Sequence, residues 1–330
     1  MTSQPPLRTA LIGPGRISVA HLDAITANSD ATLVAVAGLP DEADRTTTLA
    51  DRFHAERAVH HSDAVVGADD IDAVVLTVPN HIHAPLAIQL LNAGKHVLIE
   101  KPLTTNLTDA DQMIETAERT DRTLMVGQCR RFFPGAQRAR AMIHALGRPL
   151  AINHHLGVFA EHAATDWWTH ASEAGGLAVG LNGPHVIDTM LWLIGARPVR
   201  VYAQTRRLRD QWEGEDEATF ILDFDDGSIA TGNISLNSRA PVNHRWINGP
   251  AGSLQLIDDR NLWHDGNQIV SEEVTPYIDG DASFRNQFDE FVSAIGEQRP
   301  PESSAVEARA VVAVMEAVQS SQEKGQPIQL

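Results

Sequence analysis

A lysine lies between a glutamate and a proline at residues 100–102, directly after an apolar run at residues 96–99. Ligands bind at the carboxyl ends of strands in parallel sheets, so a strand over this run would place Lys101 where chemistry takes place. A lysine that only solvates the surface does not need a buried strand in front of it. Lys101 is therefore the first candidate for a catalytic side chain, with Glu100 beside it.

A second polar segment, residues 77–83, closes the preceding apolar run and carries His81 and His83. The carboxyl ends of parallel strands share one edge of a sheet, so this segment belongs to the same expected site. Its histidines either pack on a cofactor or take part in catalysis, and its asparagine contacts the cofactor or orders the turn. The residues assigned to cofactor binding in this segment are Thr77, Pro79, Asn80 and His83.

A glycine turn follows the first apolar run of the chain, residues 9–12, and precedes a helical pattern. Such a turn brings backbone N–H groups to a pyrophosphate at the helix N-terminus. Gly13 makes the tight turn and Gly15 permits close approach, while Ser18 replaces the third glycine of the dinucleotide fingerprint as a small residue. The turn predicts a dinucleotide site that includes Gly13, Pro14, Gly15, Arg16 and Ile17.

The residue at the end of the second strand, expected over residues 32–37, bears on the choice between NAD and NADP. NAD enzymes commonly end this strand in an acid that binds the ribose 2′-hydroxyl. Here Gly38 occupies that place and Asp41 comes three residues later. The missing carboxylate removes a repulsion toward a 2′-phosphate, with which Arg45 or Arg16 can pair. This favours NADP over NAD, although Asp41 keeps NAD open.

The elements that position these residues alternate between strands and helices. Helical patterns cover residues 85–92 and 107–119, the second with Asn106 as a plausible N-cap. Strands separated by helices and apolar throughout predict a doubly wound parallel sheet. The apolar runs are residues 9–12, 32–37, 73–78, 96–99 and 123–126.

After about residue 131 the pattern changes to consecutive strands. Two of these flank Asp225-Asp226-Gly227, a hairpin turn, so an antiparallel sheet is expected. The fold class is therefore α/β, with a Rossmann domain over residues 1–128 and an α+β domain over residues 129–330 whose last helices are free to pack on the first domain. Helices are expected at residues 136–146, 186–194, 284–295 and 308–318, and strands at residues 199–205, 218–224, 228–236 and 253–257.

Composition narrows the class of protein. The 330 residues suit two domains, and 43% of them are hydrophobic. A formal charge of -17 disfavours binding to nucleic acid or to an anionic membrane. The single cysteine, Cys129, excludes an internal disulfide and a multi-cysteine metal site. The polar N-terminus at residues 1–8 does not resemble a secretory signal, and no apolar stretch is long enough to span a membrane, so a cytoplasmic location is expected.

Taken in order, these motifs resemble the glucose–fructose oxidoreductase/inositol dehydrogenase (Gfo/Idh/MocA) family over nearly the whole chain. Each segment alone is modest, but the ordered series at family-like spacing is specific. The matching segments are residues 77–83, 94–97, 100–102, 130–132, 166–168, 175–176, 182–188, 192–195 and 252–254.

The resemblance implies a cofactor across the first sheet and a substrate between the nicotinamide and the sheet of the second domain. It implies that Lys101 hydrogen-bonds the reacting oxygen, while Glu100 and Pro102 shape the turn, and that His185 is the acid/base partner. Glu100 and Lys101 are also assigned to cofactor binding. Removing a hydride from an alcohol carbon requires a base for the hydroxyl proton, and histidine titrates near neutral pH. A lysine near the cationic nicotinamide is easier to deprotonate and can share that task.

The sequence departs from the family at one important position. Active members commonly carry Asp or Asn four residues before this histidine, where the chain has Leu181. Asn182 is adjacent but points differently, and Asp188 comes one helical turn after His185. Three interpretations stay open: Lys101 and His185 work alone, the substrate differs, or catalysis is reduced.

Several of these residues also have structural interpretations. His185 is a catalytic base or a capping or core histidine, and Arg130 binds substrate or holds the hinge between the domains. Trp167 lines a sugar face or belongs to a core or interface. The fifteen histidines show no known ligand spacing, so no metal is expected. The residues assigned to the substrate are Arg130, Trp167, Asn182 and His185.

The sequence thus predicts an NAD(P)-dependent oxidoreductase that moves a hydride to or from a hydroxyl carbon of a sugar, polyol or related carbohydrate derivative. Two alternatives remain: a reductase of a non-sugar carbonyl or diol, and a catalytically weak NAD(P)-binding sensor of the same fold. The sheet of the second domain is expected to have one face that its own chain leaves uncovered. The family resemblance implies that another copy of the chain covers this face, in a homodimer or homotetramer.

Overall fold

The computed structural model describes residues 5–273 and 281–330; residues 1–4 of the polar N-terminal segment lie outside this description. The chain forms two compact units. Among the described residues, the first comprises residues 5–104, Thr108–Cys129 and 281–308, and the second Thr105–Leu107, 130–273 and Arg309–Leu330. The chain thus leaves the first unit after Cys129, and a late segment that contains helix α10 (Ala282–Glu297) belongs to the first unit.

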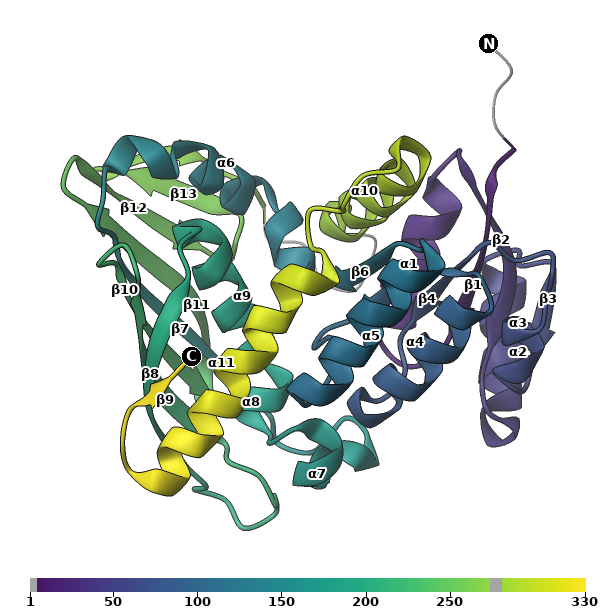
Figure 1. Ribbon diagram of the computed structural model, residues 1–330, viewed down its shortest axis with the longest axis horizontal. Coiled ribbons are helices and arrows are strands. Elements are labelled where there is room, and N and C mark those ends of the chain that lie inside the picture. The colour runs from purple at the N-terminus through teal and green to yellow at the C-terminus, as the bar shows by residue number, and fades with distance from the viewer. Residues whose placement is uncertain (1–4, 274–280) are drawn as a thin grey trace. The chain divides into compact units, whose positions relative to one another are not determined.

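The first unit is built on a six-stranded sheet in the order β3-β2-β1-β4-β5-β6 (Figure 1). Every neighbouring pair is parallel, and all residues of β4 are buried, as in a sheet covered on both faces. The direction of strand order reverses between β1 and β4, which is the point where such sheets bind ligands. The predicted Rossmann sheet is confirmed. Its strands are β1 (Leu7–Ile12), β2 (Ala31–Ala37), β3 (Arg57–Val59), β4 (Ala73–Leu76), β5 (His96–Glu100) and β6 (Leu124–Gly127).

The helices of this unit follow the apolar periodicity of the sequence. The helix expected at residues 107–119 is α5 (Leu107–Thr120), and the one expected at residues 85–92 lies within α4 (His83–Asn92). The short strand β3 was not predicted, because its three half-buried residues carry little pattern. The remaining helices are α1 (Ser18–Ala27), α2 (Ala43–Arg52) and α3 (Asp63–Val66), and α10 packs against α1.

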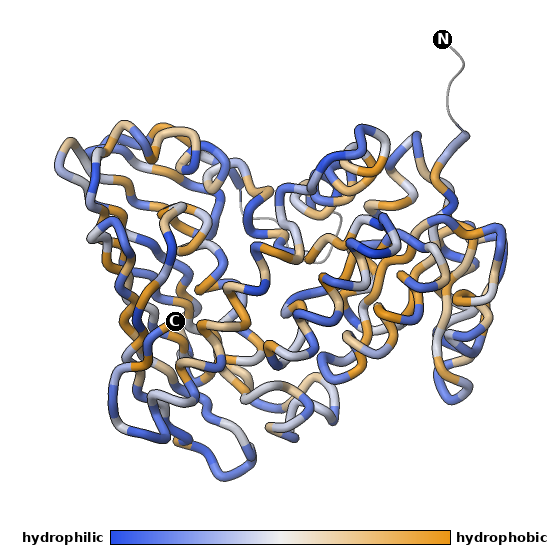
Figure 2. The backbone as a smooth tube through the Cα atoms, viewed as in Figure 1, coloured by the Kyte–Doolittle hydropathy of each residue, from blue (hydrophilic) through white to orange (hydrophobic). Residues whose placement is uncertain are grey.

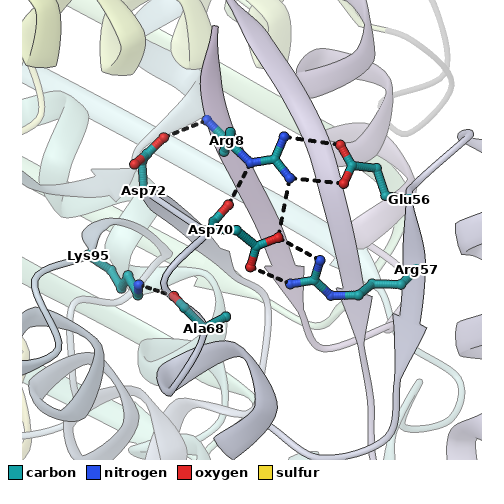
Figure 3. A network of polar contacts seen from close by, with 7 residues as sticks. All are labelled: Arg8, Glu56, Arg57, Ala68, Asp70, Asp72 and Lys95. Atoms are coloured by element: carbon teal, nitrogen blue, oxygen red, sulfur yellow. Dashed lines mark hydrogen bonds and ion pairs between the residues drawn. The ribbon is translucent and has the colours of Figure 1, made fainter. Parts of the chain in front are cut away.

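A polar network fastens the amino ends of these strands, at the edge opposite the expected site (Figure 3). The Arg8 guanidinium at the start of β1 contacts Glu56 and Asp70, and the Arg57 guanidinium lies 2.8 Å from both oxygens of Asp70. The hydrogen bonds from Arg57 hold the pKa of Asp70 well below its usual value. These side chains are exposed, so the network aligns the strand ends more than it stabilises the fold.

The second unit is built on a nine-stranded sheet in the order β14-β13-β12-β11-β7-β10-β9-β8-β15. Only the β7–β10 pair is parallel among its neighbouring pairs, which confirms the predicted, mostly antiparallel sheet. The expected hairpin joins β9 and β10 at residues 225–228. The strands are β7 (Ala151–Phe159), β8 (Pro198–Arg206), β9 (Glu217–Phe224), β10 (Ile229–Ser235), β11 (Asn237–Gly249), β12 (Gly252–Ile257), β13 (Asn261–His264), β14 (Asn267–Val270) and β15 (Ile328–Gln329).

One face of this sheet is covered and the other carries exposed residues. Burial alternates along β7 and β10, and Figure 2 shows hydrophobic and hydrophilic positions interspersed on the strands of this sheet. Helix α9 (Gly183–Ile194), buried at eleven of its twelve positions, packs on β7 and β10. The other helices are α6 (Pro134–Met142), α7 (Ala171–Ala174), α8 (Ala178–Leu181) and α11 (Ala305–Lys324).

The length and apolar content of the helices bear on whether any of them could span a membrane. No single helix in the described ranges is long and apolar enough to cross a membrane. The segments Ala171–Leu181 and Gly183–Ile194 reach that length and composition only as a bent pair.

Candidate active site

The glycine turn after β1 is fixed by its contacts with the end of β4. Gly13 has a φ of +101°, and a Cβ on it would lie 2.7 Å from the Thr77 carbonyl carbon and oxygen. No other residue fits this conformation and space. The Thr77 hydroxyl lies 2.5 Å from the Gly13 carbonyl oxygen, so Thr77 holds the turn in place.

Gly15 is a glycine for a different reason. A Cβ there would meet only the Thr77 carbonyl oxygen, at 3.8 Å, which is an ordinary contact. The protein itself therefore tolerates a side chain at this position, and its absence leaves room for a ligand against the backbone. Ser18, which opens α1, is buried and its hydroxyl donates to the Gly15 carbonyl at 2.6 Å. This geometry fits a pyrophosphate against the first turn of α1.

The end of β2 cannot carry the acid typical of NAD enzymes in this backbone. A Cβ on Gly38 would lie 2.2 Å from Thr46 Oγ1 and 2.9 Å from Pro14 Cγ. The nearby carboxylate of Glu42 accepts a hydrogen bond from the Leu39 N–H at 3.0 Å. The predicted cofactor residues Arg16, Asp41 and Arg45 are all exposed.

The segment after β4 joins the glycine turn to the lysine turn. Asn80 and His83 are buried, whereas His81 is exposed. His83 Nδ1 lies 2.8 Å from the Pro102 carbonyl oxygen and its Nε2 3.0 Å from the Val78 carbonyl oxygen. Burial lowers the pKa of His83 below its usual value. A neutral ring carries one N–H, so it donates to one of these two carbonyl oxygens and only contacts the other. The ring lies between the two backbone segments and has no exposed surface for a ligand.

Lys101 stands at the carboxyl end of β5 and is half-buried. Its backbone N–H donates to Glu100 Oε2 at 3.1 Å, and Glu100 Oε1 lies 2.8 Å from His21 Nε2 of α1. Burial raises the pKa of Glu100, but the His21 hydrogen bond and the charges of His21 and Lys101 outweigh it, so the net pKa lies below its usual value. Glu100 is thus an ionised carboxylate with a partner on each oxygen.

In the second unit, His185 lies in the first turn of α9 and is 7% exposed. The half-buried Asn182 is the N-cap of this helix, and the Asn182 carbonyl accepts from the His185 N–H at 3.1 Å. Leu181, where the family commonly has Asp or Asn, ends α8 and is buried. The part of the chain beside His185 therefore offers an apolar side chain where the family has a polar one.

Asp188 is engaged elsewhere. Arg131 donates to its two carboxylate oxygens, from Nε at 2.9 Å and from Nη2 at 2.6 Å, and both side chains are almost completely buried. Arg130 donates to Asp259 at 2.5 Å, and Asp259 also pairs with the buried Arg245. These arginines are therefore held by the second unit itself.

The remaining candidate residues are less enclosed. Trp167 and Trp168 are half-buried and meet edge to face, with ring centroids 6.2 Å apart. Among residues 5–273 and 281–330, no group of three or more His, Cys, Asp or Glu side chains is arranged to hold a metal ion.

Sequence reasoning missed three participants in these clusters: His21, Asp259 and Arg245. Each pairs with a residue far along the chain; His21, for example, is 79 positions from Glu100. A signal was available only for His21, which stands between the apolar Ala20 and Leu22 of a helical pattern, because a buried polar group needs a partner.

The fold and the geometry of the glycine turn define a Rossmann-type dinucleotide-binding protein, and comparison with known proteins identifies it as an oxidoreductase. Residues 7–128 match the model of the oxidoreductase family with the NAD-binding Rossmann fold, and residues 136–255 match the GFO/IDH/MocA C-terminal domain. The chain belongs to the Gfo/Idh/MocA family, which confirms the resemblance seen in its motifs.

Relatives of this chain have different substrates in their names. An inositol 2-dehydrogenase of Rhizobium meliloti is 31% identical over 71% of this chain and 69% of its own length. A 4-carboxy-2-hydroxymuconate-6-semialdehyde dehydrogenase of Sphingobium sp. is 26% identical over 90% of this chain and 93% of its own length. A D-xylose 1-dehydrogenase (NADP(+)) of Haloferax volcanii is 26% identical over 88% and 90%.

Solved structures share the fold. The structure of an oxidoreductase domain protein from Kribbella flavida superposes with a TM-score of 0.90, at 24% identity over 99% of both chains. Levoglucosan dehydrogenase in complex with NADH and L-sorbose superposes with a TM-score of 0.89, at 22% identity over 99% of both chains.

Proposed function

We propose that this protein is an NAD(P)-dependent dehydrogenase that transfers a hydride to or from a hydroxyl carbon of a sugar, polyol or related carbohydrate derivative. The observation that carries the proposal is Lys101, half-buried at the carboxyl end of β5 in a turn whose backbone is hydrogen-bonded to Glu100. Relatives named for inositol and D-xylose support the substrate class.

Different residues of this chain are assigned to the pyrophosphate and to the nicotinamide end of the cofactor. The backbone at Gly13 and Gly15 and the first turn of α1 hold the pyrophosphate, with Pro14, Arg16 and Ile17 around it. The residues assigned to the nicotinamide end are Thr77, Pro79 and Asn80, while Glu100 and His83 support the loops from beneath. When bound, the nicotinamide supplies the hydride acceptor or donor.

Proton movement falls to two side chains in this proposal. Lys101 donates a hydrogen bond from Nζ to the reacting oxygen and keeps that oxygen oriented. His185 accepts the hydroxyl proton during oxidation and returns it during reduction, because imidazole titrates near neutral pH. Asn182 and Trp167 are assigned to the substrate hydroxyls and to an apolar sugar face, and Arg130, held by Asp259, positions its loop.

For the cofactor we propose NADP over NAD. The support is steric: Gly38 has no space for a carboxylate that would repel a 2′-phosphate. Arg16 and Arg45 are exposed cations on the segments that flank this strand end. Binding of NADPH and NADH should be compared by nicotinamide fluorescence, and Arg45→Ala should weaken NADPH binding alone. An unchanged NADPH preference in that variant removes Arg45 from the proposal.

The catalytic proposal is tested by turnover on a panel of inositols, aldoses and anhydro sugars, followed by NAD(P)H absorbance. Lys101→Met should lower kcat by about 100- to 10,000-fold, the usual contribution of a positioned proton-transfer group, with a smaller effect on cofactor affinity. His185→Asn should also lower kcat. Turnover by Lys101→Met at the wild-type rate would contradict the assignment.

Two other functions have a specific observation in their favour. The relative from Sphingobium, named for a semialdehyde, covers 90% of this chain and favours a non-sugar carbonyl as substrate. Leu181 beside His185 favours a weakly catalytic NAD(P)-binding sensor. A semialdehyde in the substrate panel tests the first, and tight NADPH binding without any turnover supports the second.

We also propose that the protein is a homodimer or homotetramer through the open face of the second-unit sheet. The support is a set of large apolar side chains on strands of that sheet that the single chain leaves exposed, namely Tyr202, Ile221, Ile229 and Trp246. Ile221→Glu combined with Trp246→Glu should yield monomers in light scattering if this face is the interface.

A further inference from the structure

Each carboxylate oxygen of Glu100 has a partner within the protein. Its Oε1 lies 2.8 Å from His21 Nε2 and its Oε2 accepts the Lys101 N–H. Because an ionised carboxylate only accepts hydrogen bonds, His21 Nε2 must carry the proton and donate. His21 is 1% exposed, and its ring meets Phe284 edge to face with centroids 5.2 Å apart. The ring is thus fixed by both its polar edge and its apolar neighbour.

His83 contacts the other end of the same turn. Its Nδ1 lies 2.8 Å from the carbonyl oxygen of Pro102, the residue after Lys101, and its Nε2 lies 3.0 Å from the carbonyl oxygen of Val78. The ring is 0% exposed. The neutral ring carries one N–H, which donates to one of these oxygens, the Pro102 carbonyl being the nearer. Packed between both, the ring sets the lysine turn against the segment after β4, which in turn contacts Gly13 through Thr77.

We propose that His21 and His83 are positioning residues for the proposed dehydrogenase, which clamp the Glu100–Pro102 turn at its two ends and thereby fix the backbone from which Lys101 reaches the substrate. The inference rests on the proposed function for its kinetic consequence only. Neither histidine is exposed, so neither touches substrate or cofactor, and both act through Glu100 and Pro102.

The consequence follows from the demands of hydride transfer. A misplacement of about 1 Å at a reacting group is enough to slow an enzyme about 100-fold. If the His21 hydrogen bond is lost, Glu100 Oε1 is left as a buried, unpaired oxygen that must find another partner by moving. Since the other oxygen of that carboxylate holds the Lys101 N–H, the lysine moves with it.

Matched variants distinguish the effect of the hydrogen-bond donor to Glu100 from the effect of the volume of the His21 ring. His21→Gln keeps an N–H donor near Glu100, whereas His21→Leu fills similar space without one. His21→Leu should lower kcat about 100-fold, with little change in cofactor affinity. It should also shift the pH profile of kcat. His21→Gln should retain most of the wild-type kcat. His83→Leu and His83→Gln form the second pair. His154→Leu, at an equally buried histidine of the second unit, controls for general loss of stability.

A second readout does not depend on turnover. The chain has only three lysines, Lys95, Lys101 and Lys324, so trace acetylation followed by mass spectrometry reports Lys101 directly. Lys324 is exposed and serves as the internal reference. In the full-length protein, Lys101 acetylation relative to Lys324 should rise in His21→Leu and His83→Leu and stay near wild type in the Gln variants and in His154→Leu.

The combined outcomes distinguish the two proposals. If acetylation changes as expected but wild type turns over no substrate, the clamp stands and the dehydrogenase proposal fails. If wild type turns over and both kcat and acetylation are unchanged in His21→Leu and His83→Leu, the clamp is overturned. Equal losses in the Leu and Gln variants also overturn it, because the hydrogen bonds would then be irrelevant. Should His21→Leu fail to fold, the His83 pair decides.

Discussion

Gly38 and Thr46 compete for the same space at the end of β2. A Cβ added to Gly38 would lie 2.2 Å from Thr46 Oγ1, which no real Cβ tolerates. Thr46 cannot rotate away freely, because it is buried and its hydroxyl donates to the Glu42 carbonyl at 2.9 Å. The packing of Thr46 in α2 therefore excludes an acidic side chain at this strand end, and a substitution at Gly38 alone does not fit.

This relationship predicts a coupled pair of substitutions. Gly38→Asp alone should destabilise the protein by about 1–3 kcal/mol, as other overpacked sites do, measured by urea unfolding. Gly38→Asp with Thr46→Gly should recover most of that loss and should bind NADH more tightly relative to NADPH than wild type does. Thr46→Gly alone is the control for the loss of the hydroxyl. A Gly38→Asp variant as stable as wild type would show that the space is not filled.

The buried ion pair between Arg131 and Asp188 should behave as a unit. Each side chain is almost completely buried, so Arg131→Met should lower the free energy of unfolding by about 3–5 kcal/mol because it leaves a buried carboxylate unpaired. Arg131→Met combined with Asp188→Leu should be more stable than Arg131→Met alone. Additive losses in that double-mutant cycle would mean that the two groups do not depend on each other.

The sequence predicts the parts of the fold that depend on neighbouring residues. Apolar runs and intervening helical patterns identify the Rossmann sheet, and the glycine turn at Gly13 follows from its place between a strand and a helix. The lysine turn follows from its position after β5. In each case the physical signal, burial or a backbone conformation, is contained within a few consecutive residues.

What the sequence does not predict depends on pairing between distant residues. Strands β7 and β11 were missed because polar side chains stand at inward positions: His154 and Arg245 are 0% exposed and paired across the two strands. Their burial makes sense only with Asp259 and Asn243 beside them. The pairing of His21 with Glu100 was missed for the same reason, because a single sequence does not show which buried polar groups meet.

His96, at the start of β5, should make the protein sensitive to mild acid. Burial, assisted by the charge of Arg122, lowers the pKa of His96 to about 4, and the Thr123 N–H donates to its Nδ1 at 3.0 Å. The unfolded chain takes up this proton near pH 6.5, so stability is lost as the pH falls from about 6.5 to about 4, by at most about 3 kcal/mol. His96→Asn keeps an acceptor for Thr123 and should flatten unfolding free energy across this window. His61→Asn, at an exposed histidine, should leave the slope unchanged.

Glu213 and Glu215 should respond to pH in opposite directions although only one residue separates them. Burial raises the pKa of Glu215, whose Oε1 accepts the N–H groups of Leu177 and Val179 at 3.0 and 2.8 Å. A raised carboxyl pKa favours the folded state below the unfolded value and removes that advantage as the pH rises through the folded value. Glu215→Gln keeps the acceptor oxygen, so its stability relative to wild type should increase with pH.

The exposed Glu213 provides the matched comparison. The hydrogen bond from the Ala171 N–H, with a second contact from His170, lowers the pKa of Glu213. Its contribution is present above the unfolded pKa and lost as the pH falls through the folded one, so the stability of Glu213→Gln relative to wild type should decrease with rising pH. Urea unfolding of both variants at a series of pH values measures the two slopes. Slopes of the same sign would show that burial of Glu215 does not outweigh its hydrogen bonds.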